Sequence, residues 1–292
     1  MGDLLQFLVT GITIGSIYAI VALGLVTIYS VTKVINLAQG EFVMLGGMLM
    51  FTFLNFNIPY WFAILFTLVL IIIVGWMMEL TLIRPAKGAN PISLIILTLG
   101  ASLFIRGIAS MIWGKDSVRV EPFTANDPIN IAGAAITPQS IWVILLMVLI
   151  VFGLYILIDK TIIGKGFQAS SANPNAARLM GISPKKMSSF SFVLSAGLGA
   201  LAGMAIAPIM FPAYDTGLML GVKGLSVAIL GGLGSAPGAV LGGLILGLIE
   251  SLGAGYVSSG FKDAIAFGFV LLILFIRPSG LLGEKSVGKG GL

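Results

Sequence analysis

The chain has 292 residues, of which 58% are hydrophobic and 9% are charged, and this composition excludes an ordinary water-soluble domain. It contains no cysteine and no histidine, which excludes disulfides, Cys/His metal sites and Ser-His or Cys-His nucleophiles. The basic residues behind the net charge of +5 lie in short segments between apolar runs, which favours membrane topology over nucleic-acid binding. We therefore expect a multi-pass membrane protein that is not an enzyme and needs no cofactor.

Apolar runs long enough to cross a bilayer, about 20 residues each, recur along the chain. Five are regular: Leu4–Tyr29, Tyr60–Ile83, Ile92–Trp113, Ile141–Ile158 and Met187–Phe211. Three are less regular: Val34–Phe56, Gly224–Leu252 and Ala264–Ile276. The pattern predicts an all-α, polytopic transmembrane bundle of about eight hydrophobic segments, some of them broken or re-entrant, in a single domain over residues 1–292.

The distribution of lysine and arginine predicts the orientation, because cytoplasmic loops are enriched in them. Residues 159–186 carry five basic residues and one acidic residue, so we expect this loop in the cytoplasm. Residues 114–139 carry two basic and three acidic residues and should be extracytoplasmic. The tail, residues 277–292, has Arg277, Lys285 and Lys289 and should be cytoplasmic, with the N-terminus outside.

The glycine-rich segment 224–252 must then enter and leave the membrane on the outer side. A break at Gly234–Pro237 would leave arms of about 11 and 15 residues, too short to cross fully, with Ser235 as cap and Pro237 at the first helical position. Glycine and alanine recur every four residues in the second arm, which allows close helix packing. The break serves packing alone, or it lines a translocation path. The candidate path residues here are Gly231, Gly232, Gly234, Ser235, Pro237, Gly238 and Gly242.

A second polar interruption lies near the cytoplasmic end of the segment 34–56 and comprises Asn36, Gln39, Gly40 and Glu41. A carboxylate there is costly unless it is paired, hydrated or interfacial. Glu41 either pairs with Lys33 at the interface or has a pore-side or gating role.

Other charges within apolar runs are few. Arg106 either snorkels toward the outer surface or faces a wet interior. Glu79 should be an interfacial anchor beside Arg84.

The chain has no phosphate-binding loop of the form G-x-x-x-x-G-K-[ST], so it cannot hydrolyse ATP in that way. The cytoplasmic loop predicts a short helix, capped by Asn173, begun by Pro174 and ended at Gly181. Such a helix is a plain connector, or it seats in a groove of a separate ATPase subunit. The candidate docking residues are Asn173, Ala176, Ala177, Arg178, Leu179, Met180 and Gly181.

The chain also contains four separated segments, "GLVTIYSVTKVINLAQGEFVMLGG", "ARLMGISPKK", "VAILGGLGSAPGAVLGGLILGLIE" and "FKDAIAFGFVLLILFIRPSGLLG". In this order they resemble the LivH type of inner-membrane permease from branched-chain amino acid ABC importers. Relatives often have histidine where this chain has Gln39, and often Arg and Asp where it has Gln168, Ser170 and Asn173.

The resemblance implies a bacterial or archaeal inner-membrane subunit that pairs with a second, related permease as a heterodimer. It also implies two cytoplasmic ATP-binding subunits and a periplasmic or extracellular substrate-binding protein. The substrates would be leucine, isoleucine and valine, or related small amino acids and amides. The alternative is a stand-alone facilitator or channel for small polar solutes, which the glycine-rich break alone would suit equally.

Overall fold

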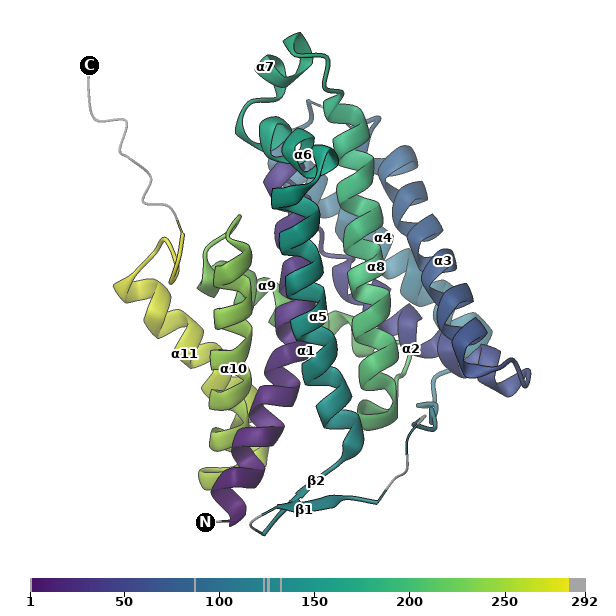
Figure 1. Cartoon of the computed structure of the whole chain (residues 1–292), viewed down its shortest axis with the longest axis vertical. Coiled ribbons are helices and arrows are strands. Elements are labelled where there is room, and N and C mark those ends of the chain that lie inside the picture. Colours follow the sequence, from purple (N-terminus) through teal and green to yellow (C-terminus); the bar gives the residue numbers. More distant parts are fainter. Residues whose placement is uncertain (1, 87, 123, 125–126, 132, 284–292) are drawn as a thin grey trace.

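The computed structural model describes residues 2–86, 88–122, 124, 127–131 and 133–283, and most of them are helical (Figure 1). The tail residues Lys285 and Lys289, which contribute to the predicted orientation, lie outside the described residues. The first half holds α1 (Gly2–Thr32), α2 (Gln39–Asn55), α3 (Tyr60–Met78), the π-helix η1 (Glu79–Ile83), α4 (Pro91–Trp113), β1 (Ile129–Ile131) and β2 (Ala134–Ile136). The second half holds α5 (Pro138–Lys160), α6 (Ile162–Ala172), α7 (Pro174–Leu179), α8 (Pro184–Met210), α9 (Thr216–Gly231), α10 (Ala236–Tyr256), the 3₁₀-helix η2 (Ser259–Phe261) and α11 (Lys262–Ile276).

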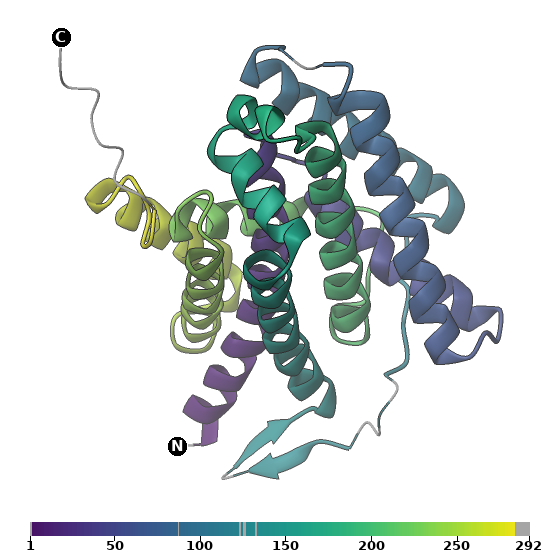
Figure 2. The ribbon, with the colours of Figure 1, turned by 45° about the horizontal axis from the view of Figure 1, so that its top comes forward.

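Seven helices among the described residues are long and apolar enough to cross a membrane, and this confirms the predicted helical bundle. The two-stranded hairpin β1–β2 is a small departure from an all-α chain and lies in the predicted outer loop. Figures 1 and 2 show α6 and α7 at one end of the bundle, and the N-terminus and the hairpin at the other. Which end faces the cytoplasm stays a prediction from charge.

Helix α1 forms the centre of the bundle, and 89% of its most apolar stretch is buried inside the protein. It packs most extensively on α10, where glycines of both helices meet. A Cβ atom added to Gly15 would lie 2.8 Å from the carbonyl oxygen of Gly243, and one added to Gly247 would overlap Gly11 and Gly15. The small residues of α10 thus allow the close helix contact that their spacing predicts.

A helix–link–helix pattern occurs twice, in opposite directions. Helices α1 and α8 run in opposite directions (Figure 1), and each ends at a residue with left-handed backbone, Lys33 (φ 58°) and Phe211 (φ 46°). A short non-helical link then leads to α2 or to α9, and the two short helices pack against each other at Gly40 and Gly217. Each short helix also packs on the opposite long one, α2 on α8 and α9 on α1. Inverted repeats with interrupted helices of this kind are common in transporters.

The glycine-rich segment is broken as predicted, but its arms are longer than expected. Helix α9 has 16 residues and α10 has 21, and the non-helical residues between them are 232–235. The prediction that both arms are too short to cross was therefore wrong for α10, which is long enough for a membrane span. The predicted α9 was too short because Lys223 interrupts its apolar run, and the charge of Lys223 is neutralised by residues of other helices. The predicted α10 was too short because the helix continues past Leu252 to Tyr256.

Candidate functional site

Helix α7 forms where the sequence predicts the docking helix. The Asn173 side chain accepts hydrogen bonds from the backbone N–H groups of Asn175 (3.0 Å) and Ala176 (3.1 Å), which caps the first turn. Pro174 occupies the first turn, and Gly181 just beyond the helix has φ 80°, a conformation that glycine adopts without strain. The predicted docking residues therefore comprise the cap, four residues of α7 and the two residues that follow the helix.

The surface of α7 is unusually apolar for a loop. The side chains of Leu179 and Met180 are 90% and 81% exposed, whereas Ala177 is buried against the bundle. An exposed Leu-Met pair held on a rigid turn is the kind of protrusion that seats in a hydrophobic groove of a partner.

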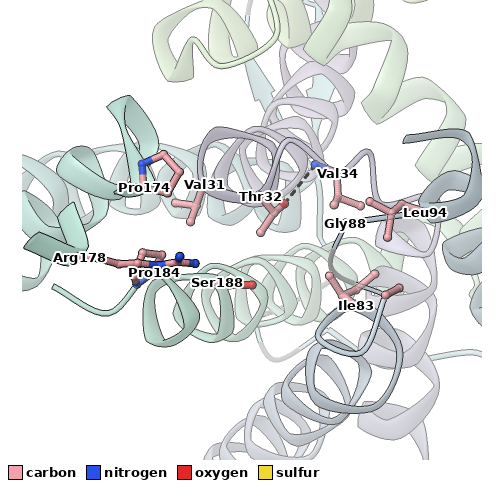
Figure 3. A pocket seen from close by; sticks show the side chains of 11 residues that line it. Val31, Thr32, Val34, Ile83, Gly88, Leu94, Pro174, Arg178, Pro184 and Ser188 are labelled. Atoms are coloured by element: carbon pink, nitrogen blue, oxygen red, sulfur yellow. Dashed lines mark hydrogen bonds between the residues drawn. The ribbon is translucent and has the colours of Figure 1, made fainter. Parts of the chain in front are cut away.

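A cavity of about 190 Å³ lies at the base of this helix. Figure 3 shows Pro174 and Arg178 of the α7 segment facing Val31 of α1, and Ser188 of α8 on the same side. Ile83 of η1, the loop that follows η1 and the first turn of α4 close the cavity. Helix α7 therefore lies across this cavity from the ends of α1 and η1, and its packing contacts are with α6 and α8.

Beside this cavity, Glu79 anchors η1 to α8. The Arg84 guanidinium donates to Glu79 at 2.9 Å, and the hydroxyls of Ser188 (3.0 Å) and Ser189 (2.8 Å) also donate to the carboxylate. Glu79 thus lies beside Arg84 as expected and is fully buried by protein, and its place at the membrane interface stays a prediction.

The polar cluster at the start of α2 is buried. The Gln39 amide donates to the carbonyl of Ser195 (3.2 Å) and accepts from the Ser195 hydroxyl (2.6 Å), which also lies 2.8 Å from the carbonyl oxygen of Gly24. The Asn36 side chain accepts from the Ala38 N–H at 3.1 Å and shapes the link before α2. These contacts hold α1, α2 and α8 together.

Glu41 pairs with Arg106, not with Lys33. Its carboxylate accepts from the Arg106 guanidinium (2.9 Å) and from the Ser102 hydroxyl (2.7 Å), both on α4. Glu41 has no exposed surface, and Lys33 is exposed with its ammonium 5.4 Å from the ring centroid of Tyr29. The alternative of interfacial pairing with Lys33 was wrong because α1 ends at Thr32 and the link carries Glu41 into the bundle. The Arg106 guanidinium is held inside the bundle by Glu41 and Ser102 instead of snorkelling outward, and its side chain is 16% exposed.

The break between α9 and α10 brings its glycines into backbone contact. A Cβ atom on Gly231 would overlap the carbonyl of Gly238, and one on Gly238 would overlap that of Gly231. Gly242 packs on the same turn of α9, and the Ser235 hydroxyl accepts from the Gly238 N–H at 3.1 Å. Gly234, with φ 99°, has no atom within 4 Å of an added Cβ and is exposed. Pro237 lies in the first turn of α10 and is exposed.

The segment after α11 folds back onto this break. The N–H groups of Leu281 and Leu282 donate to the carbonyls of Leu230 (2.7 Å) and Gly231 (2.9 Å) at the end of α9. Carbonyls at a helix end lack partners within the helix, so this segment caps α9. A Cβ atom on Gly280 would lie 2.6 Å from the N atom of Gly232. We call residues 278–283 the strap.

The two groups of predicted path residues do not form one site. The cluster of Asn36 to Glu41 meets the first turn of α9 at Gly217, whereas the break lies at the other end of α9. Sixteen helical residues span about 24 Å, so the two groups lie far apart.

A buried charge cluster around Lys223 escaped sequence reasoning. The Lys223 ammonium lies 2.7 Å from Glu250 on α10 and 2.7 Å from Asp263 on α11, and it donates to the Tyr18 hydroxyl at 3.0 Å. Tyr18 in turn donates to Glu250 at 2.9 Å. A lysine inside an apolar run was a usable signal, because buried charges in membranes are paired.

The chain is similar to known transport proteins over almost its whole length. The family described as "Branched-chain amino acid transport system / permease component" matches residues 7–276. The high-affinity branched-chain amino acid transport system permease proteins BraD of Pseudomonas aeruginosa and LivH of Escherichia coli K12 are each 29% identical, over 98% of this chain and 97% of theirs. A probable branched-chain amino acid transport permease protein LivH of Methanocaldococcus jannaschii is 32% identical over 92% of this chain and 89% of its own. No solved structure matches the chain significantly.

Proposed function

Because the chain belongs to the family of permease components of branched-chain amino acid transport systems, we propose that it imports leucine, isoleucine and valine, or related small amino acids and amides. It is a multi-pass cell-membrane permease subunit rather than an enzyme, and permeases of this family work with ATPase and substrate-binding partners. The finer composition that we propose is one second, related permease, two cytoplasmic ATP-binding subunits and one external binding protein. Residues 159–186 would form the cytoplasmic docking loop within a single permease domain.

The observation that carries the proposal is the apolar tip of α7. Leu179 and Met180 would enter a groove of the ATPase, and Arg178 would remain at the membrane side of the contact. Closure of the ATPases would move α7 and, through its contacts with α6 and α8, would bias the bundle between inward and outward access.

Uptake in reconstituted vesicles tests this role. We expect leucine uptake to require ATP and both partner classes, and the double change Leu179→Ser with Met180→Ser to reduce it at least tenfold while the permease still inserts. Val257→Ser is the matched control, since Val257 is 73% exposed at the opposite end of the bundle. Downhill flux through the chain alone would contradict the proposal and would support the stand-alone facilitator. Normal uptake in the double variant would contradict the role of α7.

A further inference from the structure

A pocket of about 720 Å³, lined by polar and apolar residues, lies between α6 and the glycine-rich break. Its size falls in the range of small-molecule sites, about 300–1,000 Å³. Its walls come from the end of α1, from α5 and α6, and from the loop between α9 and α10. The residues that line it are Val26, Thr27, Ser30, Lys33, Ile158, Phe167, Gln168, Ser171, Ala172, Leu233, Gly234, Ser235 and Ala236.

Three of the four hydroxyl groups in the wall use their protons on backbone carbonyls and are set to accept hydrogen bonds. Thr27 donates its proton to the carbonyl of Leu23 (2.7 Å), Ser30 to that of Val26 (2.8 Å), and Ser171 to that of Ser30 (2.7 Å). A hydroxyl has one proton and two lone pairs, so each oxygen keeps acceptor capacity once its proton is used. The pocket therefore offers acceptors to a donor-rich group such as an ammonium.

Lys33 supplies the opposite chemistry, as the one charged side chain among the described residues that line the pocket. It directly follows α1 and has a left-handed backbone (φ 58°). No carboxylate of the described residues lies within ion-pair distance of its ammonium. Ile158, Phe167 and Leu233 add an apolar wall. One cation, several acceptors and an apolar wall match a molecule with a carboxylate, an ammonium and an aliphatic chain.

We infer that this pocket binds a free α-amino acid zwitterion on the side of the docking helix. Lys33 holds the carboxylate, the hydroxyl oxygens of Thr27, Ser30 and Ser171 face the ammonium, and the side chain packs on the apolar wall. The inference rests on the proposed function for the choice of an amino acid. Because α6 leads directly into the Asn173 cap of α7, an occupied pocket ties α1 and the break to the docking helix. A product that accumulates inside would thus slow its own import.

Binding to the complete chain in lipid nanodiscs tests the site without any partner. The probes are L-leucine, 4-methylpentanoic acid, which lacks the ammonium, and 3-methylbutylamine, which lacks the carboxylate. Calorimetry should give leucine binding at least tenfold tighter than either analogue. Lys33→Gln should weaken leucine binding at least tenfold and Ser171→Ala several-fold. Lys115→Gln, at the opposite end of the bundle, is the matched control and should bind as the unaltered chain does.

Several outcomes would overturn the inference. These are no leucine binding, equal binding by Lys33→Gln with an unchanged unfolding temperature, or binding of 4-methylpentanoate or inorganic phosphate as tight as that of leucine. The last result would indicate a plain anion site, such as one for a lipid headgroup. If Lys33→Gln loses its native unfolding transition, Ser171→Ala decides alone. Failure of the proposed function can be told apart from failure of this inference. The first would appear as leucine uptake that needs no ATPase, whereas the second would appear as a change in the nanodisc binding assay.

Discussion

Glu41 and Arg106 lie 65 positions apart in the sequence, and their ion pair links α2 to α4 inside the bundle. The sequence predicts that a carboxylate at this depth needs a partner, but it offers Lys33 as the nearest cation. Distance along the chain could not decide, because the link after α1 turns Glu41 away from Lys33. The same limit applies to Lys223, whose partners Glu250 and Asp263 belong to helices that follow the break.

Removing one partner of the buried pair should cost more than removing both charges. Arg106→Met leaves the Glu41 carboxylate uncompensated, and we expect a loss of about 3–5 kcal/mol in the free energy of unfolding. The double variant Arg106→Met with Glu41→Gln should recover much of that loss. Thermal unfolding in detergent measures both, with Lys33→Gln as the control. A loss in the double variant that equals the sum of the single losses would contradict the pairing.

Lys223 should be more sensitive than its exposed partner. Lys223→Met removes the ammonium 2.7 Å from the buried Glu250 and leaves only that of the half-exposed Lys262 at 4.0 Å, so about 3 kcal/mol of stability should be lost. Asp263→Asn should cost about 1 kcal/mol or less, because its side chain is 37% exposed and Glu250 still neutralises the lysine. The same unfolding assay compares the two variants. A larger loss of stability for Asp263→Asn would contradict the claim that the buried Lys223–Glu250 pair contributes most to the cluster.

At the scale of elements, the sequence predicts most helices because their apolar runs are long and their caps are local. The Asn173 cap and the break near Ser235 depend on neighbouring residues and are predicted correctly. The length of α9 is not predicted, because the buried charge of Lys223 is neutralised only when α10 and α11 pack against α9. The strap is also invisible in the sequence, since its hydrogen bonds join backbone groups about 50 residues apart.

The crossing of α2 and α9 should tolerate no side chain at Gly40. A Cβ atom there would overlap the carbonyl oxygen of Gly217, so Gly40→Ala should lower stability by about 1–3 kcal/mol and impair uptake. Gly100→Ala on α4 is the control, because no atom lies within 4 Å of its added Cβ and alanine is the better helix former. Equal unfolding temperatures of the two variants would refute the close crossing.

The strap should protect the end of α9 from opening. Gly280→Val forces a branched residue into φ 78° and against Gly232, so the strap should detach and expose the carbonyls of Leu230 and Gly231. Hydrogen–deuterium exchange should then speed up at least tenfold for amides in the last turn of α9. Gly268→Ala on α11, with nothing near its added Cβ, is the control. Unchanged exchange in Gly280→Val would show that the strap is dispensable for this turn.

At the scale of the whole molecule, the orientation decides what α7 can meet. Helix α7 lies at one end of the bundle, and the N-terminus and the β1–β2 hairpin both lie at the other end (Figure 1). The side on which each end lies follows only from the distribution of charged residues, above all from the excess of basic residues in the loop 159–186. A docking helix is useful to an ATPase only on the cytoplasmic side, so the proposed function depends on this assignment.

Single cysteines can read the orientation directly, because the chain contains none. Lys186 and Lys115 are both exposed, and they lie at the two ends of the bundle. In intact cells, a membrane-impermeant maleimide should label Lys115→Cys and spare Lys186→Cys, and inverted membrane vesicles should give the opposite pattern. The two variants control for each other, because both carry one exposed thiol on a loop or a helix end. Labelling of Lys186→Cys in intact cells would place α7 outside, where no ATPase could reach Leu179 and Met180, and the proposed coupling through α7 would fail with the topology.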